Sequence, residues 1–254
     1  MKAMIFAAGM GTRLKPLTDR MPKALVQVGG KPLIEHISRK IKDSGFESAV
    51  VNVHHFADML QSWLQSQDWF DFQVSDERKM LLETGGAILH ARPYLDGCSD
   101  FLVHNVDILT NADLKWFADQ HRKDSLATLL VSPRKTSRYF LFHPESMRLV
   151  GWTNIPSGET ILTDSSLQKE DCLMFAFSGI HIMSEKIFDI MENYVNETGI
   201  PSNGDAGVRF SIKDFYMYAA SSYPIYGVNL PDFRMMDVGK LDTLSQAEEF
   251  LSTL

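Results

Sequence analysis

Apolar residues in the first half of the chain occur either in short unbroken runs or in longer stretches with helical spacing. Residues 3–8 form an unbroken run that ends at Gly9, which is typical of a strand buried on both faces of a parallel sheet. Residues 32–44 repeat apolar positions at helical spacing and stop at Gly45. The pattern therefore predicts a buried strand followed by a helix.

The same alternation of elements continues over the next sixty residues. A strand is expected at 49–54, helices at 56–65 and 85–92, and a further strand at 101–106. Strands and helices in alternation predict a mostly parallel, Rossmann-like central sheet with helices on both faces.

Beyond a helix expected at 114–121, the pattern changes to short strands separated by turn-rich segments. We expect these strands to add to one side of the sheet in antiparallel orientation, at residues 127–132, 139–143, 149–153 and 174–182. A last helix is expected from about residue 243 to 251. No linker, charge block or internal repeat interrupts the chain, so we expect one domain over residues 1–254 and no C-terminal β-helix.

Composition narrows the classes of function. A formal net charge of −7 argues against nucleic-acid binding, which needs a surplus of cations on one face. Two cysteines, neither at zinc-ligand spacing, fit a reducing compartment. The first apolar run is too short for a signal peptide, and no run has the length to span a bilayer. These features predict a soluble cytoplasmic protein that binds no membrane.

A glycine-rich segment lies at the first strand-to-helix turn, where open α/β sheets bind ligands. Glycine lets backbone N–H groups approach a phosphate, although many such turns are plain connections. Leu14 stands where a dinucleotide fingerprint needs glycine, and the Gly-Lys-Ser/Thr of a P-loop is absent. Instead Arg13 and Lys23 follow Gly9 and Gly11. Two cations on a proline-stiffened path suit a triphosphate.

Several motifs, in order along the chain, carry a resemblance to a known family. They are Gly9–Thr18, Pro22–Val26, Lys31–Pro32, Leu82–Gly86, Asn105–Asp107 and Asp237–Gly239. Together they closely resemble the signature of the sugar-1-phosphate nucleotidyltransferases. The Glu-Thr-Gly-Gly form looks most like the branch of N-acetylmuramate-1-phosphate uridylyltransferase and mannose-1-phosphate guanylyltransferases.

This resemblance implies a glycosyltransferase-A-like fold and an enzyme of nucleotide-sugar biosynthesis for the cell envelope. Such an enzyme transfers a nucleoside monophosphate from a nucleoside triphosphate to a sugar 1-phosphate and releases pyrophosphate, with Mg²⁺ as cofactor. Because the attacking sugar phosphate is already anionic, catalysis needs in-line positioning and charge neutralisation rather than a strong base.

Roles for individual residues follow from the same resemblance. It implies that Asp107 and Asp237 are the Mg²⁺ ligands, although an Asp at a strand end is otherwise more often a turn or capping residue. Arg13 would bind the triphosphate, and Lys23 would lie near the α-phosphate or the acceptor phosphate.

The resemblance also implies two sets of binding residues. Nucleotide contacts are expected from backbone and side-chain groups of Ala8, Gly9, Gly11, Thr12, Arg13, Glu83, Gly85 and Gly86. Sugar contacts are expected at Asn154 and Gly179. A purely structural role for Glu83 and a glycine bulge at Gly179 stay open as alternatives.

Three features depart from the family pattern or lie outside it. Val106 stands where the family has a small residue, and Lys240 stands where it has threonine, so both put the shape of the metal site in doubt. A basic cluster of Arg134, Lys135 and Arg138 is interpreted as a solvated turn, with a substrate phosphate as the alternative.

Two other functions remain open. A cytidylyltransferase acting on phosphocholine would need an aromatic cage, for which the candidates are Tyr139, Phe140, Trp152, Phe175 and Phe177. A regulator that binds nucleotide sugars without catalysis would keep the fold but has no reason to keep the charged residues. The sequence leaves the base, the sugar and the oligomeric state undetermined.

Overall fold

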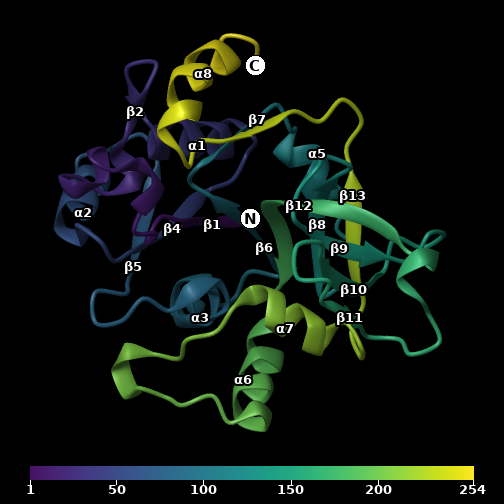
Figure 1. Cartoon of the computed structure of the whole chain (residues 1–254). Coiled ribbons are helices and arrows are strands. Elements are labelled where there is room, and N and C mark those ends of the chain that lie inside the picture. The colour runs from purple at the N-terminus through teal and green to yellow at the C-terminus, as the bar shows by residue number, and fades with distance from the viewer.

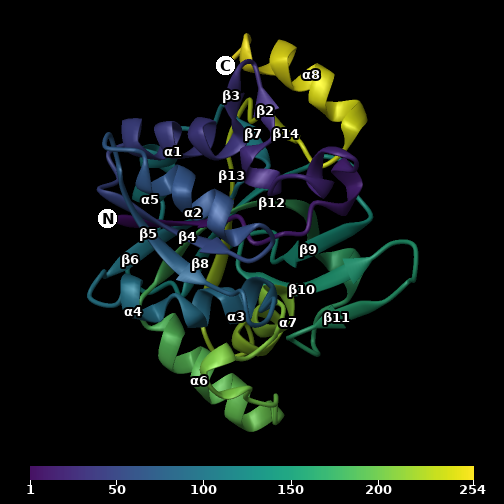
Figure 2. The ribbon, with the colours of Figure 1, turned by 90° about the vertical axis from the view of Figure 1, so that its left-hand side faces the viewer.

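The structure is a computed structural model that describes residues 1–254. A ten-stranded mixed sheet runs through the molecule (Figures 1 and 2). Its parallel half has the order β6, β1, β4, β5, and each of these strands pairs in parallel with its neighbour. The bounds are β1 Lys2–Phe6, β4 Ser48–Val53, β5 Asp71–Asp76 and β6 Asp100–Asn105. The predicted parallel sheet is confirmed.

The other half of the sheet is built around one long strand, β12 (Leu173–Ser184), which runs antiparallel to β6. It also pairs with β8 and β9, and β9 continues the sheet through β10 to β11. These strands are β8 Ala127–Ser132, β9 Arg138–Phe142, β10 Leu149–Asn154 and β11 Thr160–Leu162. The expected antiparallel additions are present, but β13 (Ile225–Asn229) joins β8 in parallel.

Helices cover both faces of the sheet, as predicted (Figure 1). One face carries α1 Leu33–Asp43, α2 Ala57–Gln65, α5 Leu114–Asp119 and α8 Leu241–Leu251. The other carries α3 Glu83–His90, α4 Arg92–Leu95, α6 Ile187–Thr198 and α7 Ile212–Ala219. None of these helices has both the length and the apolarity required to cross a membrane.

Alternating residues of β1 show how the sheet divides the interior into two cores. Ala3 and Ile5 pack in a cluster with α1 and α2, whereas Met4 packs in a second cluster with α3 and α6. The division follows from the two-residue period of a strand, which points successive side chains to opposite faces.

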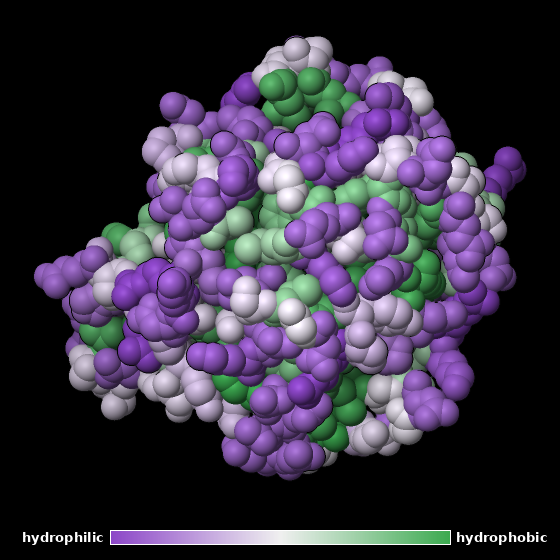
Figure 3. Space-filling view, turned by 180° about the vertical axis from the view of Figure 1, so that it is seen from behind, coloured by the Kyte–Doolittle hydropathy of each residue, from purple (hydrophilic) through white to green (hydrophobic).

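The back of the molecule, as seen in Figure 3, shows patches of hydrophobic residues among the hydrophilic ones that make up most of that face.

Two short sheets extend the framework beside the main one. β2 (Gln27–Val28) pairs with β3 (Lys31–Pro32), and β7 (Ile108–Thr110) pairs antiparallel with β14 (Met235–Asp237). The second pairing matters most, because it joins the segment after β6 to a segment near the end of the chain.

Two buried histidines on neighbouring strands make stability depend on pH. His104 on β6 and His181 on β12 are at most 1% exposed, and burial lowers their pKa values from 6.5 to about 4 and about 3. The unfolded chain therefore binds more protons than the folded protein below pH 6.5. We expect the free energy of unfolding to be constant above about pH 7 and to fall as the pH drops from about 6.5 toward 4.

Urea denaturation at pH 7, 6 and 5 checks this expectation. Burial also lowers the pKa of His121, which adds to this trend, whereas burial raises the pKa of Glu77, which opposes the trend above the ordinary value of 4.5. His104→Gln, which removes one titrating group, should show a shallower decline than the wild type. An equal free energy of unfolding at the three pH values would contradict the expectation.

Candidate active site

A pocket of about 260 Å³ opens at the carboxyl ends of β1, β4 and β6. We call it the loop pocket, because the glycine-rich loop after β1 forms one of its walls. Open α/β sheets bind ligands at this edge. Lys23 and Asp107 also line it, as do Glu83 and Thr84 from the start of α3.

The glycine-rich loop offers unused hydrogen-bond donors. The N–H groups of Gly9, Met10 and Gly11 donate to no other group of the protein, and a Cβ on Gly9 would meet nothing within 4 Å. Gly11 has a φ of 61° and packs against Thr18, whose hydroxyl donates to the Gly11 carbonyl at 2.8 Å. Thr12, which follows, is exposed. Such a loop suits the oxygens of a phosphate.

Sequence reasoning missed the side chain that holds the start of this loop. Asn52 on β4 is 3% exposed, and its Oδ1 accepts from the N–H groups of Ala7 and Ala8 at 2.6 and 3.3 Å. Its Nδ2 donates to Glu77 at 2.7 Å, and Glu77 also accepts from the N–H of Leu82. The available signal was an asparagine within the apolar run of β4.

Replacing Asn52 with leucine should weaken both the fold and the loop pocket. Leucine has a similar shape but leaves two backbone N–H groups and one oxygen of the Glu77 carboxyl without a partner. Each loss of this kind costs about 1–3 kcal/mol. We expect a lower urea midpoint and weaker nucleotide binding by calorimetry. Asn196→Leu on the exposed face of α6 is the control, and equal midpoints for the two variants would contradict this role.

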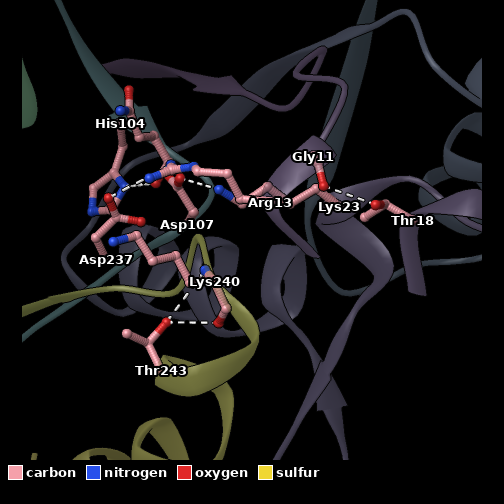
Figure 4. A network of polar contacts seen from close by, with 10 residues as sticks. Gly11, Arg13, Thr18, Lys23, His104, Asp107, Asp237, Lys240 and Thr243 are labelled. Atoms are coloured by element: carbon pink, nitrogen blue, oxygen red, sulfur yellow. Dashed lines mark hydrogen bonds and ion pairs between the residues drawn. The ribbon is translucent and has the colours of Figure 1, made fainter. Parts of the chain in front are cut away.

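Four charged side chains meet where the loop pocket adjoins a second pocket that Asp237 lines (Figure 4). Lys23 and Asp107 form an ion pair, with side chains only 10% and 17% exposed. Arg13 lies 3.9 Å from Asp237, and both of these side chains are about half exposed at 56% and 49%. Lys240 extends from the start of α8 toward Asp237 (Figure 4).

The backbone explains why two distant aspartates meet. In the β7–β14 pair, Asp237 is registered with Ile108, and the N–H of Val238 donates to the Asp107 carbonyl at 2.8 Å. The β7–β14 pair therefore makes the backbones of Asp107 and Asp237 neighbours. Sequence motifs pointed to both residues, but only this pairing brings them together.

The two carboxylates of this cluster fit a hard divalent cation that prefers oxygen ligands. No group of three His, Cys, Asp or Glu side chains that could hold an ion is present. Mg²⁺ does not need one, because one or two carboxylates commonly hold it together with substrate phosphates and water. Asp107 and Asp237 supply that minimum, and Lys23 and Arg13 balance their charge.

The Leu82–Gly86 segment lies at the N-terminal end of the helix that the sequence predicted at residues 85–92. It begins α3, with Glu83 at a φ of 61°. Glu83 and Thr84 line the loop pocket, and Glu83 pairs with Arg209 at 2.8 Å.

Gly85 and Gly86 lie against the backbone of residues 208–210. Their N–H groups donate to the Phe210 carbonyl at 2.9 and 3.1 Å, and a Cβ on Gly86 would overlap the carbonyl of Val208. The absence of a side chain at these glycines therefore leaves room for the backbone of residues 208–210. The expected contact of Gly85 and Gly86 with the nucleotide stays a prediction.

A second pocket of about 370 Å³, which we call the strand pocket, adjoins the first and shares Phe6, Thr84 and Asn105 with it. Asp237 and Gly179 line it. Gly179 has a φ of 79°, lies at the irregularity of the β12–β8 pairing and would place a Cβ 2.7 Å from Asn105. Gly179 therefore lies at an irregularity of the strand, as the alternative interpretation held, and its expected contact with the sugar stays a prediction.

Asn154 is not brought to either of these two pockets. It ends β10, and its backbone bonds to Glu159 and Gly158 close the turn toward β11. Its position gives no support to the expected sugar contact.

Comparison with known proteins decides the family. A model described as "Nucleotidyl transferase" matches residues 2–253. The chain belongs to the nucleotidyl transferase family. The match covers the glycine-rich loop, both aspartates and all the pockets described above.

Curated members of this family resemble the chain over different lengths. An N-acetylmuramate alpha-1-phosphate uridylyltransferase of Caulobacter vibrioides is 46% identical over 109 residues, which is 41% of this chain and 45% of that protein. A UTP–glucose-1-phosphate uridylyltransferase of Synechocystis is 27% identical over 97% of this chain and 62% of its own length. The chain thus spans about half to three fifths of these relatives.

A solved structure of similar fold covers the whole chain. It is a putative glucose-1-phosphate thymidylyltransferase from Bacillus anthracis, with a TM-score of 0.77 and 18% identity over 100% of this chain and 96% of that one. At this identity the likeness concerns the fold, and it supports the expected nucleotidyltransferase architecture.

Proposed function

We propose that this protein is a Mg²⁺-dependent nucleotidyltransferase that joins a nucleoside monophosphate from a nucleoside triphosphate to a sugar 1-phosphate. The observation that carries the proposal is the group of two carboxylates and two cations beside a loop with unused N–H donors. Family membership supports the same reaction class.

The loop pocket is the proposed nucleotide site. The N–H groups from Gly9 to Thr12 would bind phosphate oxygens, and the wall formed by Ala8, Gly9 and Glu83 would contact the nucleoside. Arg13, which is half exposed, is free to bridge two oxygens of the triphosphate. The curated relatives are named for uridylyl transfer, so UTP is the first triphosphate to test.

The proposed reaction forms one bond and breaks one. An oxygen of the sugar phosphate attacks the α-phosphorus, and the bond from the α-phosphorus to the oxygen bridging to the β-phosphate breaks, so that pyrophosphate leaves. Lys23 lies between the loop and Asp107, where it would neutralise the α-phosphate and the incoming phosphate. Such preorganised charges contribute about 2.7–4 kcal/mol each to transition-state stabilisation.

Asp107 and Asp237 would hold the metal, which supplies positive charge that offsets the repulsion between the two phosphate-bearing substrates. Before substrates bind, the two carboxylates and the cations balance one another. We infer that on binding the cations turn to phosphate oxygens and the carboxylates are released for the ion.

Measuring pyrophosphate release with a panel of substrates tests this function. The panel combines UTP, GTP, CTP and dTTP with several sugar 1-phosphates, in Mg²⁺ and in EDTA. We expect turnover with at least one pair and none in EDTA. Tight binding of nucleotide sugars without turnover of any pair would instead identify a regulator.

The phosphocholine alternative meets an electrostatic objection. Four of the five aromatic residues considered for a cage line a third pocket, namely Tyr139, Phe140, Trp152 and Phe177. The same pocket is lined by three cations, Arg134, Arg138 and Lys213. Because these cations repel a quaternary ammonium group, the third pocket favours an anion over choline.

A further inference from the structure

The third pocket, which we call the far pocket, continues the strand pocket away from the loop. It has a volume of about 290 Å³ and shares Arg134, Phe177, Ser211, Ile212 and Lys213 with the strand pocket. It shares no residue with the loop pocket. The three pockets therefore follow one another in the order loop, strand and far.

Positive charge dominates the far pocket. Arg138 forms no ion pair and no side-chain hydrogen bond, and Arg134 donates only to the Phe177 carbonyl at 2.9 Å. Lys213 pairs with Asp214 and lies 4.7 Å from the ring centre of Trp152. No Asp or Glu lines the pocket. Two guanidinium groups without a carboxylate partner, in a protein of net charge −7, indicate an anionic ligand.

The 1-phosphate of the acceptor sugar does not account for these cations. Its proposed place is beside Lys23, Asp107 and Asp237, and none of these residues lines the far pocket. A sugar 1-phosphate that places its phosphate there and its ring in the strand pocket would extend its remote substituents toward Arg134 and Arg138.

We propose that the far pocket is an acceptor subsite for a second anionic group, a carboxylate or a phosphate, carried by the sugar at a position remote from C1. This assignment rests on the proposed nucleotidyl transfer. Planar guanidinium groups bind such anions through two hydrogen bonds at once, and the faces of Tyr139 and Trp152 pack against the apolar part of the substituent.

Matched acceptors test the subsite. One pair is N-acetylglucosamine 1-phosphate and N-acetylmuramate 1-phosphate, which differ by a lactyl ether with its carboxylate. A second set is glucose 1-phosphate, glucuronic acid 1-phosphate and glucose 1,6-bisphosphate. We expect kcat/KM to be at least about tenfold higher for one anionic acceptor than for its neutral match. Equal or lower values for all the anionic acceptors would overturn the proposal.

Two neighbouring substitutions separate a specific contact from general surface charge. Arg138→Gln removes a guanidinium that lines the far pocket, and Lys135→Gln removes a charge from the same segment outside it. We expect the ratio of kcat/KM between anionic and neutral acceptors to fall about tenfold in Arg138→Gln and to stay unchanged in Lys135→Gln. Equal ratios in the two variants would overturn the subsite.

Calorimetry distinguishes failure of the subsite from failure of the proposed function. The same five sugar phosphates are titrated into the wild type and Arg138→Gln, with no transfer required. Turnover of neutral acceptors without preferential binding of any anionic one would leave the function intact and reject the subsite. Preferential binding that Arg138→Gln abolishes, without turnover of any pair, would support the subsite and reject the function.

Discussion

Asp107→Asn should lower turnover by about 10²–10³-fold while leaving the protein folded. The amide keeps the size of the side chain and can still accept from Lys23, but it removes the charge proposed to hold Mg²⁺. Steady-state pyrophosphate release at increasing Mg²⁺ measures the effect. We also expect half-maximal activation to move to a higher Mg²⁺ concentration.

A matched control makes this test specific. Asp113→Asn makes the same chemical change six residues further on, at the N-cap of α5, where the side chain accepts from the Trp116 N–H. Asparagine caps helices as well as aspartate does, so this variant should retain activity and stability. Turnover near the wild-type rate in Asp107→Asn would remove this residue from the metal site.

Gly86→Ala should destabilise the fold by about 2–3 kcal/mol and lower Tm by roughly 5–10 °C. Alanine is normally the better helix former by about 1 kcal/mol, so the loss would come from overlap with the Val208 carbonyl. Thermal unfolding followed by circular dichroism measures it.

The control for this variant is Gly199→Ala, at the C-cap of α6. There a φ of 67° strains alanine, but no atom lies within 4 Å of the added Cβ, so we expect a loss of only about 1 kcal/mol. An unchanged Tm in Gly86→Ala would contradict the expected overlap, and weaker nucleotide binding by this variant would favour the expected contact of Gly86 with the nucleotide.

The parallel half of the fold could be predicted because its strands are apolar on both faces. β1, β4 and β6 stand out as mostly apolar runs between helical stretches. β5 was missed because Asp71, Gln73 and Asp76 break its apolar character at the edge of the sheet. The helices α6 and α7 were missed as well, although their amphipathic spacing was available.

The charged part of the site could be foreseen from motifs, but its surroundings could not. Asn52 and Glu77 act through hydrogen bonds between β4 and the segment after β5, and no local spacing encodes such contacts. The glycines at 85 and 86 have a role that depends on residues 208–210, far along the chain. Arg134 and Arg138 suggested a solvated turn, and both are exposed, but no local pattern could show that they border a pocket formed with β10, β12 and α7.

The positions of the loop pocket and Asp237 along the chain have a consequence for synthesis on the ribosome. The loop pocket takes its whole lining from residues 6–107, whereas Asp237 joins Asp107 only through β14. A nascent chain that has emerged as far as α7 carries the nucleotide-facing wall but lacks the second carboxylate. Catalytic competence would therefore arise abruptly, when the final strand docks, and premature termination before that point would yield a protein unable to transfer.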